Sequence, residues 1–289
     1  MQEFFLSIWE ALRTGAKIPV GRWAKQAVDW LIDKGGFLFD WLSTVLKTMI
    51  DGLVWLLELP HPFVFTALVV ALALWLKRSV PLAVFVAVSL LFIINQGYWD
   101  DMIKTLALII AAAVVCMSVG VPLGIAAAHN PRFSAFLRPV LDLMQTIPTF
   151  VYLIPALILF GLGMVPGLVA TVIFAIPAPI RLTELGVKST PKQLIEAGEA
   201  FGATPRQLLW KVELPWALPQ IMAGLTQTIM LSLSMVVIAA LVGAPGLGVP
   251  VVRALNTVNI AKGFEAGLII VLVAIVLDRL CRVNEKGRG

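Results

Sequence analysis

The chain alternates long apolar stretches with short polar breaks, and this pattern predicts helices that cross a membrane. The segment 217–243, for example, carries no charged residue over 27 positions, whereas a bilayer-spanning helix needs only about 20 apolar residues. Uncharged stretches of this length argue against a large soluble helical protein. We expect an all-α polytopic membrane helix bundle with about seven spans, at residues 61–76, 79–96, 102–128, 138–160, 164–181, 217–243 and 263–281.

The first 60 residues differ from the rest of the chain in their polarity. They hold six Lys or Arg and seven Asp or Glu among many aromatic residues. Within 37–59 an apolar helical stripe is interrupted by Asp40, Lys47, Asp51 and Glu58. This pattern predicts an amphipathic helix lying in the membrane interface. An internal scaffold helix packed on other spans is an equally good interpretation.

These differences divide the chain into regions. The first two spans are short and separated by Lys77 and Arg78, which predicts a tight hairpin. The start of the chain has no basic region followed by a small-residue cleavage site, so we expect no cleavable signal peptide. The expected regions are an N-terminal amphipathic or scaffold region 1–60, a transmembrane hairpin 61–98, a core transmembrane domain 99–282 that includes a polar loop 182–216, and a tail 283–289.

Composition and charge support the membrane assignment and suggest an orientation. Hydrophobic residues make up 60% of the chain and charged residues 13%, compared with about 25% charged in a soluble domain. The net charge of +5 would suit a nucleic-acid partner, but the basic residues lie mostly at span ends. With seven spans, 13 Lys and Arg gather on one side. That side should be cytoplasmic, with the N-terminus outside, the C-terminus inside and no nucleic acid bound.

Prolines interrupt several of the spans. Such breaks are tolerated where neighbouring helices or a water-filled path satisfy the freed backbone groups. Breaks in successive spans favour a gated path, and ordinary helix kinks are the simpler alternative. The prolines concerned are Pro122, Pro148, Pro155, Pro177 and Pro179.

The loop 182–216 contains two similar helix starts, at Thr190 and at Thr204. In each, the threonine is an expected N-cap, proline occupies the first helical position, and a glutamine three residues after the threonine completes a capping box. We therefore expect two short helices, at 191–201 and 205–213. A rigid helical pair at a membrane face could transmit the movement of a bound partner to the spans. The simpler interpretation is a well-folded loop with no such role.

Two further residues define the ends of these helices. Gly202 suits the left-handed backbone position that terminates a helix. The residue before proline avoids helical geometry, so the second helix should stop before Pro215.

The spacing within this loop resembles the EAA loop of ABC-importer permeases, and every interval of that pattern is matched. Gly198 stands where the family has a second alanine, and Val212 where it has isoleucine; the glycine could loosen the helix. In that family the loop docks into a groove on the ATPase. The resemblance implies docking roles for Glu196, Ala197, Gly198, Gly202, Pro205, Val212, Leu214 and Pro215.

The resemblance extends over about residues 95–282. Segments 142–167 and 224–248 look like the glycine betaine/proline permeases of the osmoprotectant-uptake group. This likeness implies a type I ABC-importer permease fold in the bacterial inner membrane. It also implies transport of glycine betaine, proline betaine, choline or a related quaternary ammonium osmolyte, without a choice among them.

The resemblance implies several partners. The chain has no glycine-rich phosphate loop ending in Gly-Lys-Ser/Thr, so we expect no cofactor in this chain, with ATP and Mg on a separate ATP-binding subunit. An external substrate-binding protein and a second copy of this chain, forming a homodimer, are also implied. Membrane lipid is the surrounding solvent. No catalytic residue and no metal site are expected.

Candidates for the substrate path lie in the span 138–160. Aromatic faces stabilise a quaternary ammonium group without a formal negative charge. Phe150 and Tyr152, beside Thr146, are therefore the path candidates, with ordinary helix packing as the alternative. Asp142 follows Arg138 by four residues, which predicts a local ion pair.

The turn 243–248 is a candidate gate through Gly246 and Gly248, with a plain connecting turn as its equal competitor.

Two other functional classes remain open at this stage. A membrane-embedded enzyme would need a catalytic constellation, but the two histidines, His61 and His129, lie at different span ends, and neither HExxH nor Gly-x-Ser-x-Gly occurs. An ion-coupled secondary transporter of small amino-acid-like solutes would favour acidic groups near the midplane, and the spans are nearly free of charge there.

Overall fold

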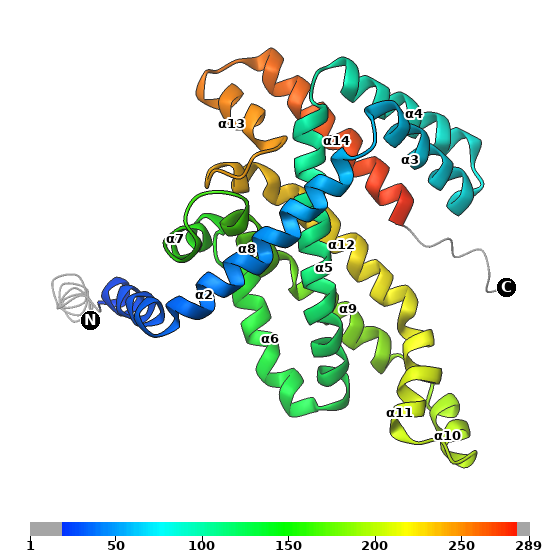
Figure 1. The fold of residues 1–289 in the computed structure, drawn as a ribbon. Coiled ribbons are helices and arrows are strands. Elements are labelled where there is room, and N and C mark those ends of the chain that lie inside the picture. Colours follow the sequence, from blue (N-terminus) through cyan, green and yellow to red (C-terminus); the bar gives the residue numbers. More distant parts are fainter. Residues whose placement is uncertain (1–18, 282–289) are drawn as a thin grey trace, which may run out of the picture. The chain divides into compact units, whose positions relative to one another are not determined.

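The computed structural model describes residues 19–281, and every regular element within that range is helical. The expectation of an all-α bundle is therefore confirmed. Figure 1 shows the helices in chain order. They are α2 (Val20–Glu58), α3 (Pro62–Lys77), α4 (Val80–Asn95), α5 (Trp99–His129), α6 (Pro131–Thr146), α7 (Thr149–Phe160), α8 (Met164–Ala175), α9 (Pro177–Lys188), α10 (Lys192–Ala200), α11 (Pro205–Leu208), a π-helical segment η1 (Leu209–Glu213), α12 (Leu214–Ala240), α13 (Gly248–Asn256) and α14 (Ile260–Cys281).

The chain forms two compact units, Met1–Leu42 and Ser43–Gly289. The helix expected at 37–59 exists but starts much earlier, at Val20, so that α2 runs through the division. In the second unit, Leu46 and Ile50 of α2 are buried, whereas Trp55 is exposed. The part of α2 in the second unit therefore has one buried face, and Trp55 lies outside that face, exposed. The interfacial role of residues 1–60 stays a prediction, and residues 1–18 and the tail 283–289 lie outside the described residues.

By length and composition alone, four to six membrane spans qualify within the described part of the chain, and the expected number of about seven, with the orientation that depends on it, stays a prediction. Four helical stretches qualify alone: Trp99–His129, Met164–Lys188, Pro205–Ala240 and Ile260–Cys281. Two bent helix pairs raise the number to six, and Val80–Asn95 is a shorter apolar helix.

The expected continuous span at 138–160 is wrong. The chain breaks at Ile147–Pro148, and α6 and α7 meet at 95°. Ile147 has extended backbone angles, which agrees with the steric restriction that a following proline imposes. The aromatic residues expected in one straight span therefore lie on a separate, short helix.

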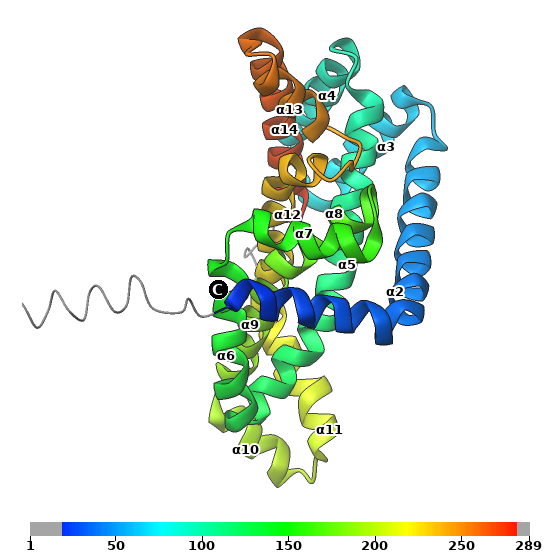
Figure 2. The same ribbon diagram turned by 90° about the vertical axis from the view of Figure 1, so that its left-hand side faces the viewer.

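The centre of the second unit is built from α5, α9 and α12, with α9 packed against both of the others (Figure 2). Close approach depends on glycine: a Cβ at Gly124 of α5 would lie 2.6 Å from the carbonyl oxygen of Ile180 in α9. Larger residues would force these helices apart. An apolar cluster that includes Met102, Ile103, Val236 and Ile269 connects α5, α12 and α14.

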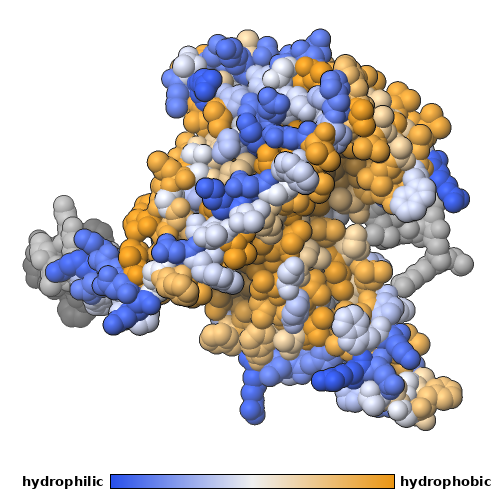
Figure 3. Space-filling model, viewed as in Figure 1, coloured by the Kyte–Doolittle hydropathy of each residue, from blue (hydrophilic) through white to orange (hydrophobic). Residues whose placement is uncertain are grey.

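The hydrophobic surface follows the expectation for a membrane protein. In Figure 3, hydrophobic residues cover the middle of the helical bundle, and hydrophilic residues gather over α10 and α11 at one end and over the α13–α14 end. Many large apolar side chains are exposed in these helices, as a lipid environment permits.

Candidate functional site: the α10–α11 hairpin

The segment 190–213, here called the α10–α11 hairpin, extends beyond the ends of α9 and α12 (Figures 1 and 2). Its second helix starts as the sequence indicates. The Gln207 amide donates to the Thr204 hydroxyl oxygen at 3.4 Å, and the Thr204 amide donates to the Gln207 side chain at 2.8 Å. This reciprocal capping box satisfies two N–H groups that a helix start leaves unpaired.

The turn between the two helices depends on Gly202. Its φ is +75°, in the left-handed region that favours glycine. The Gly202 amide donates to Glu199 and the Ala203 amide to Gly198, at 2.8 and 3.0 Å. These bonds satisfy carbonyl groups at the end of α10 and confirm the prediction of a left-handed stop.

The capping box expected at Thr190 is wrong. Helix α10 begins at Lys192, its N-cap is Pro191, and no side-chain cap is formed. The Thr190 amide bonds to Val187 of the preceding helix, and its side chain is buried, with no partner for its hydroxyl among the described residues. The Thr190 side chain is therefore buried at the end of α9 and caps no helix.

The expected stop before Pro215 is also wrong. The chain stays helical from Pro205 to Ala240, and the five residues Leu209–Glu213 form a π-helical segment. Proline removes one amide donor and its ring collides with the preceding helical turn. A wider π-type turn accommodates such a disruption without ending the helix. The hairpin is thus continuous with α12.

The residues assigned to docking lie on this hairpin with different exposures. Gly198, which replaces the family's alanine, is half-buried, and a Cβ there would lie 2.5 Å from Leu208 Cδ2. The glycine therefore allows α10 to pack closely on α11 rather than loosening it. Of the remaining positions, Glu196, Ala197, Gly202, Pro205 and Pro215 are exposed, and Val212 and Leu214 are half-buried.

Large apolar side chains are exposed on the same hairpin, and sequence reasoning missed them. Phe201 is 93% exposed and Trp210 is 70% exposed. An exposed aromatic residue in a short polar helical segment is a signal that sequence alone could have offered. Such side chains suit a protein interface, where aromatic residues are enriched.

A polar contact joins the hairpin to the transmembrane core. His129 Nε2 at the end of α5 lies 2.9 Å from Glu213 Oε2, and His129 Nδ1 lies 2.9 Å from the Ile125 carbonyl oxygen. The Glu213 side chain is largely buried. Sequence reasoning treated His129 only as an isolated residue at a span end, since 84 positions separate it from Glu213.

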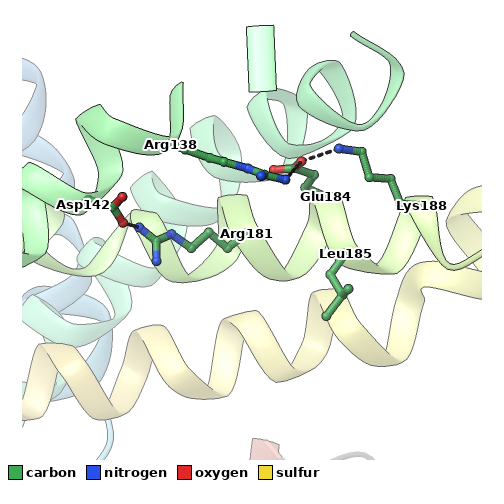
Figure 4. Close-up of a pocket in the computed structure, with 6 residues that line it drawn as sticks. All are labelled: Arg138, Asp142, Arg181, Glu184, Leu185 and Lys188. Atoms are coloured by element: carbon green, nitrogen blue, oxygen red, sulfur yellow. Dashed lines mark hydrogen bonds and ion pairs between the residues drawn. The ribbon is translucent and has the colours of Figure 1, made fainter. Parts of the chain in front are cut away.

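A second charged cluster lies between α6 and α9, in a pocket of about 330 Å³ (Figure 4). The ion pair expected between Asp142 and Arg138 is wrong. Asp142 pairs with Arg181 of α9, while Arg138 lies 3.8 Å from Glu184. The two helices pack side by side, so Asp142 and Arg138 each face a charged side chain of α9 rather than one another.

Glu184 is the centre of this cluster. Its carboxylate accepts hydrogen bonds from Ser134 at 2.6 Å and from Lys188 at 2.5 Å. Side-chain bonds of this kind stabilise a largely buried carboxylate. The cluster therefore holds α6 against α9.

The structure separates the three substrate-path candidates. Thr146 ends α6 and is exposed, and Phe150, on α7, is 58% exposed. Tyr152 is buried, and its hydroxyl donates to the Met144 carbonyl oxygen across the α6–α7 break. The path role of these residues stays a prediction.

The candidate gate is tightly packed against α5. The Leu247 amide donates to the Thr105 hydroxyl oxygen at 2.9 Å, and the Thr105 hydroxyl donates to the Asp101 carbonyl at 2.8 Å. A Cβ at Gly246 would lie 2.6 Å from Thr105 Oγ1, and one at Gly248 would lie 2.2 Å from the Val236 oxygen. Only glycine fits either position, and a gating role stays a prediction.

Comparisons with known proteins agree with this architecture. Residues 120–288 match the family of binding-protein-dependent transport system inner membrane components. The chain is 46% identical to the glycine betaine transport system permease protein OpuAB of Bacillus subtilis, over 94% of this chain and 98% of that protein. It is 44% identical to the glycine betaine/proline betaine permease protein ProW of Escherichia coli, over 94% of this chain and 77% of that protein.

A solved structure supports the same conclusion. A chain of the MetNI methionine ABC transporter in inward-facing conformations has a TM-score of 0.55 and 25% identity, covering 62% of this chain and 92% of that one. These similarities disfavour the ion-coupled secondary transporter. The chain belongs to the family of binding-protein-dependent transport system inner membrane components, and it is a multi-pass, inner-membrane permease subunit of an ABC importer.

Proposed function

We propose that this permease imports glycine betaine, proline betaine, choline or a related quaternary ammonium osmolyte, driven by a separate ATP-binding subunit. The observation that supports the docking proposal most directly is the α10–α11 hairpin. It is capped at Thr204, turned at Gly202 and packed at Gly198, and it presents Phe201 and Trp210. A hairpin held in one conformation loses little entropy when it docks.

In this proposal the exposed residues around Glu196 and Ala197 contact the ATP-binding subunit, which holds ATP and Mg. Val212, Leu214 and Pro215 join the docking segment to α12 without a break. Movement of the docked hairpin is therefore passed directly into a membrane-spanning helix. A flexible connection between the hairpin and α12 would not transmit this movement.

The cargo proposal rests on the relatives named for glycine betaine. A quaternary ammonium group that crosses about 30 Å of hydrocarbon requires a path that compensates its charge. Aromatic side chains supply that compensation through cation–π attraction, and the exposed Phe150 ring on α7 is the candidate. An external substrate-binding protein delivers the cargo, and two copies of the chain enclose the path.

The proposal is tested in proteoliposomes that contain the permease and its ATP-binding subunit, with the substrate-binding protein added. Uptake of radiolabelled glycine betaine should require ATP and should continue when a protonophore collapses the proton gradient. Choline and proline betaine serve as competitors. Uptake that stops with the protonophore while ATP is maintained would refute the ATP-driven mechanism.

A further inference from the structure

The helix α5 carries a side-chain contact to the α10–α11 hairpin near one end and a contact to the 243–248 turn near the other. At the first end, His129 meets Glu213. At the second, the Thr105 hydroxyl accepts a hydrogen bond from the Leu247 amide. The two α5 residues are separated by about 36 Å along a helix that rises about 1.5 Å per residue. Figures 1 and 2 show α5 running between these two regions.

We propose that α5 couples the conformation of the α10–α11 hairpin to that of the 243–248 turn. His129 and Thr105 are the positioning residues, because each contacts one of these two segments. This inference rests on the proposed docking of an ATP-binding subunit. It does not depend on which cargo is carried.

The contact between His129 and Glu213 is suited to transmit displacement. Each ring nitrogen of His129 faces an oxygen acceptor at 2.9 Å, so the ring is held on both sides. Two hydrogen bonds at the ring require two protons. One lies between Nδ1 and the Ile125 carbonyl oxygen, and the other lies between Nε2 and Glu213, carried either by the ring or by the Glu213 carboxyl group. Glu213 is buried, and a buried carboxylate that loses its partner is strongly disfavoured. Movement of Glu213 therefore moves the end of α5 with it.

Apolar packing supports this contact from the membrane side. Met117, Val121, Ile125 and Ala128 of α5 pack against a cluster formed by Val187, Ala217 and Ile221, with Leu214 beside them. Leu214 follows Glu213 directly. The His129–Glu213 contact thus lies at the edge of a tightly packed apolar cluster, and tight packing transmits strain.

The opposite contact is equally constrained. Thr105 is buried, and its hydroxyl both donates to the Asp101 carbonyl and accepts from Leu247. Gly246 lies so close that a Cβ would collide with this hydroxyl. A shift of α5 along its axis therefore cannot leave the 243–248 turn in place.

The test uses the permease–ATPase complex in nanodiscs. Pro245, which is exposed in the turn, is replaced by cysteine as a reporter, and Cys281 is replaced by serine; Cys116 is buried. The measured quantity is the rate at which a maleimide labels residue 245, with and without ATP and vanadate. We expect nucleotide to change this rate in the reporter background.

His129→Ala should reduce the nucleotide-induced change by roughly tenfold, because losing a hydrogen bond to a charged group shifts an equilibrium by about that factor. His129→Gln should restore it, since its side-chain amide can donate to Glu213. Thr105→Val, which keeps the shape but removes the hydroxyl, should have the same effect as His129→Ala, and Thr105→Ser should restore the response.

The double variant His129→Ala/Thr105→Val should be no worse than either single variant, because both interrupt the same connection. Co-purification of the ATP-binding subunit and gel filtration show whether each variant remains assembled. A full nucleotide response at residue 245 in assembled His129→Ala would overturn the inference. So would a His129→Gln variant as defective as His129→Ala, since packing alone would then explain the loss. Failure of the complex with the unaltered permease to take up glycine betaine would count against the cargo proposal alone.

Discussion

Replacement of Gly202 isolates the contribution of a single backbone angle to docking. Gly202 has φ +75°, and apart from its two neighbours in the chain no residue has an atom within 4 Å of the position that a Cβ would occupy. A substitution therefore introduces no clash, and only the backbone conformation is penalised. For a β-branched residue this penalty is about 1–2 kcal/mol, which corresponds to a factor of roughly 5–30 in an equilibrium.

We expect Gly202→Val to be inserted in the membrane at normal levels, since the apolar spans that drive insertion are unchanged. The strained turn re-aims α10 relative to α11, so the exposed docking surface is correctly arranged in a smaller fraction of molecules. Association with the ATP-binding subunit should weaken by roughly 5–30-fold. Substrate-stimulated ATP hydrolysis should fall with it.

The assay is co-purification of the ATP-binding subunit, followed by ATP hydrolysis in reconstituted membranes. Gly202→Asn is the matched control, because asparagine adopts the left-handed conformation far more readily than valine. Asparagine should retain most of the docking. Equal defects in the two variants would show that the positive φ is irrelevant, and full transport by Gly202→Val would show that this hairpin is not the coupling element.

Three further predictions follow from the topology and the helix contacts. Cysteine placed at Ser7 should react with an impermeant reagent in intact cells and cysteine at Asn284 should not; labelling at 284 would refute the proposed orientation. Tyr152→Phe removes the hydroxyl bond across the α6–α7 break and should cost about 0.5–1.5 kcal/mol, measured as a lower unfolding temperature in detergent; an unchanged temperature would contradict a structural role for that bond. Arg181→Asp should lower the unfolding temperature slightly, and the exchanged pair Asp142→Arg/Arg181→Asp should recover it, because exposed ion pairs contribute only about 0–1 kcal/mol.

The predictable features are those that depend on interactions between residues close together in the sequence. An uncharged stretch such as 217–243 has one stable solution in lipid, a helix that satisfies its own backbone hydrogen bonds. The cap at Thr204 and the left-handed turn at Gly202 depend on residues that are neighbours in sequence. The spacing around Glu196 was equally readable, and it led to the family that the comparisons confirm.

The errors arose where a local rule was overridden by an adjoining helical segment or by a tertiary contact. Pro215 lies within a helix because a π-helical segment absorbs it, and Thr190 caps nothing because its side chain is buried at the end of α9. The rule for residues four apart assigned Asp142 to Arg138, but α9 places Arg181 closer. In each case a correct local preference was overridden by a neighbouring turn or helix.

The sequence by itself determined that this protein is a helical membrane protein with a capped polar hairpin, because helix formation and capping depend on residues a few positions apart. Its identity as a permease came from the resemblance of that hairpin to the EAA loop. Only the tertiary structure decided which faces of the helices meet. It placed His129 against Glu213, Gly198 against Leu208 and Thr105 against Leu247. The physical reason is that an apolar helix has no periodic polar face to orient it in lipid, so its rotation is set by close packing at small residues.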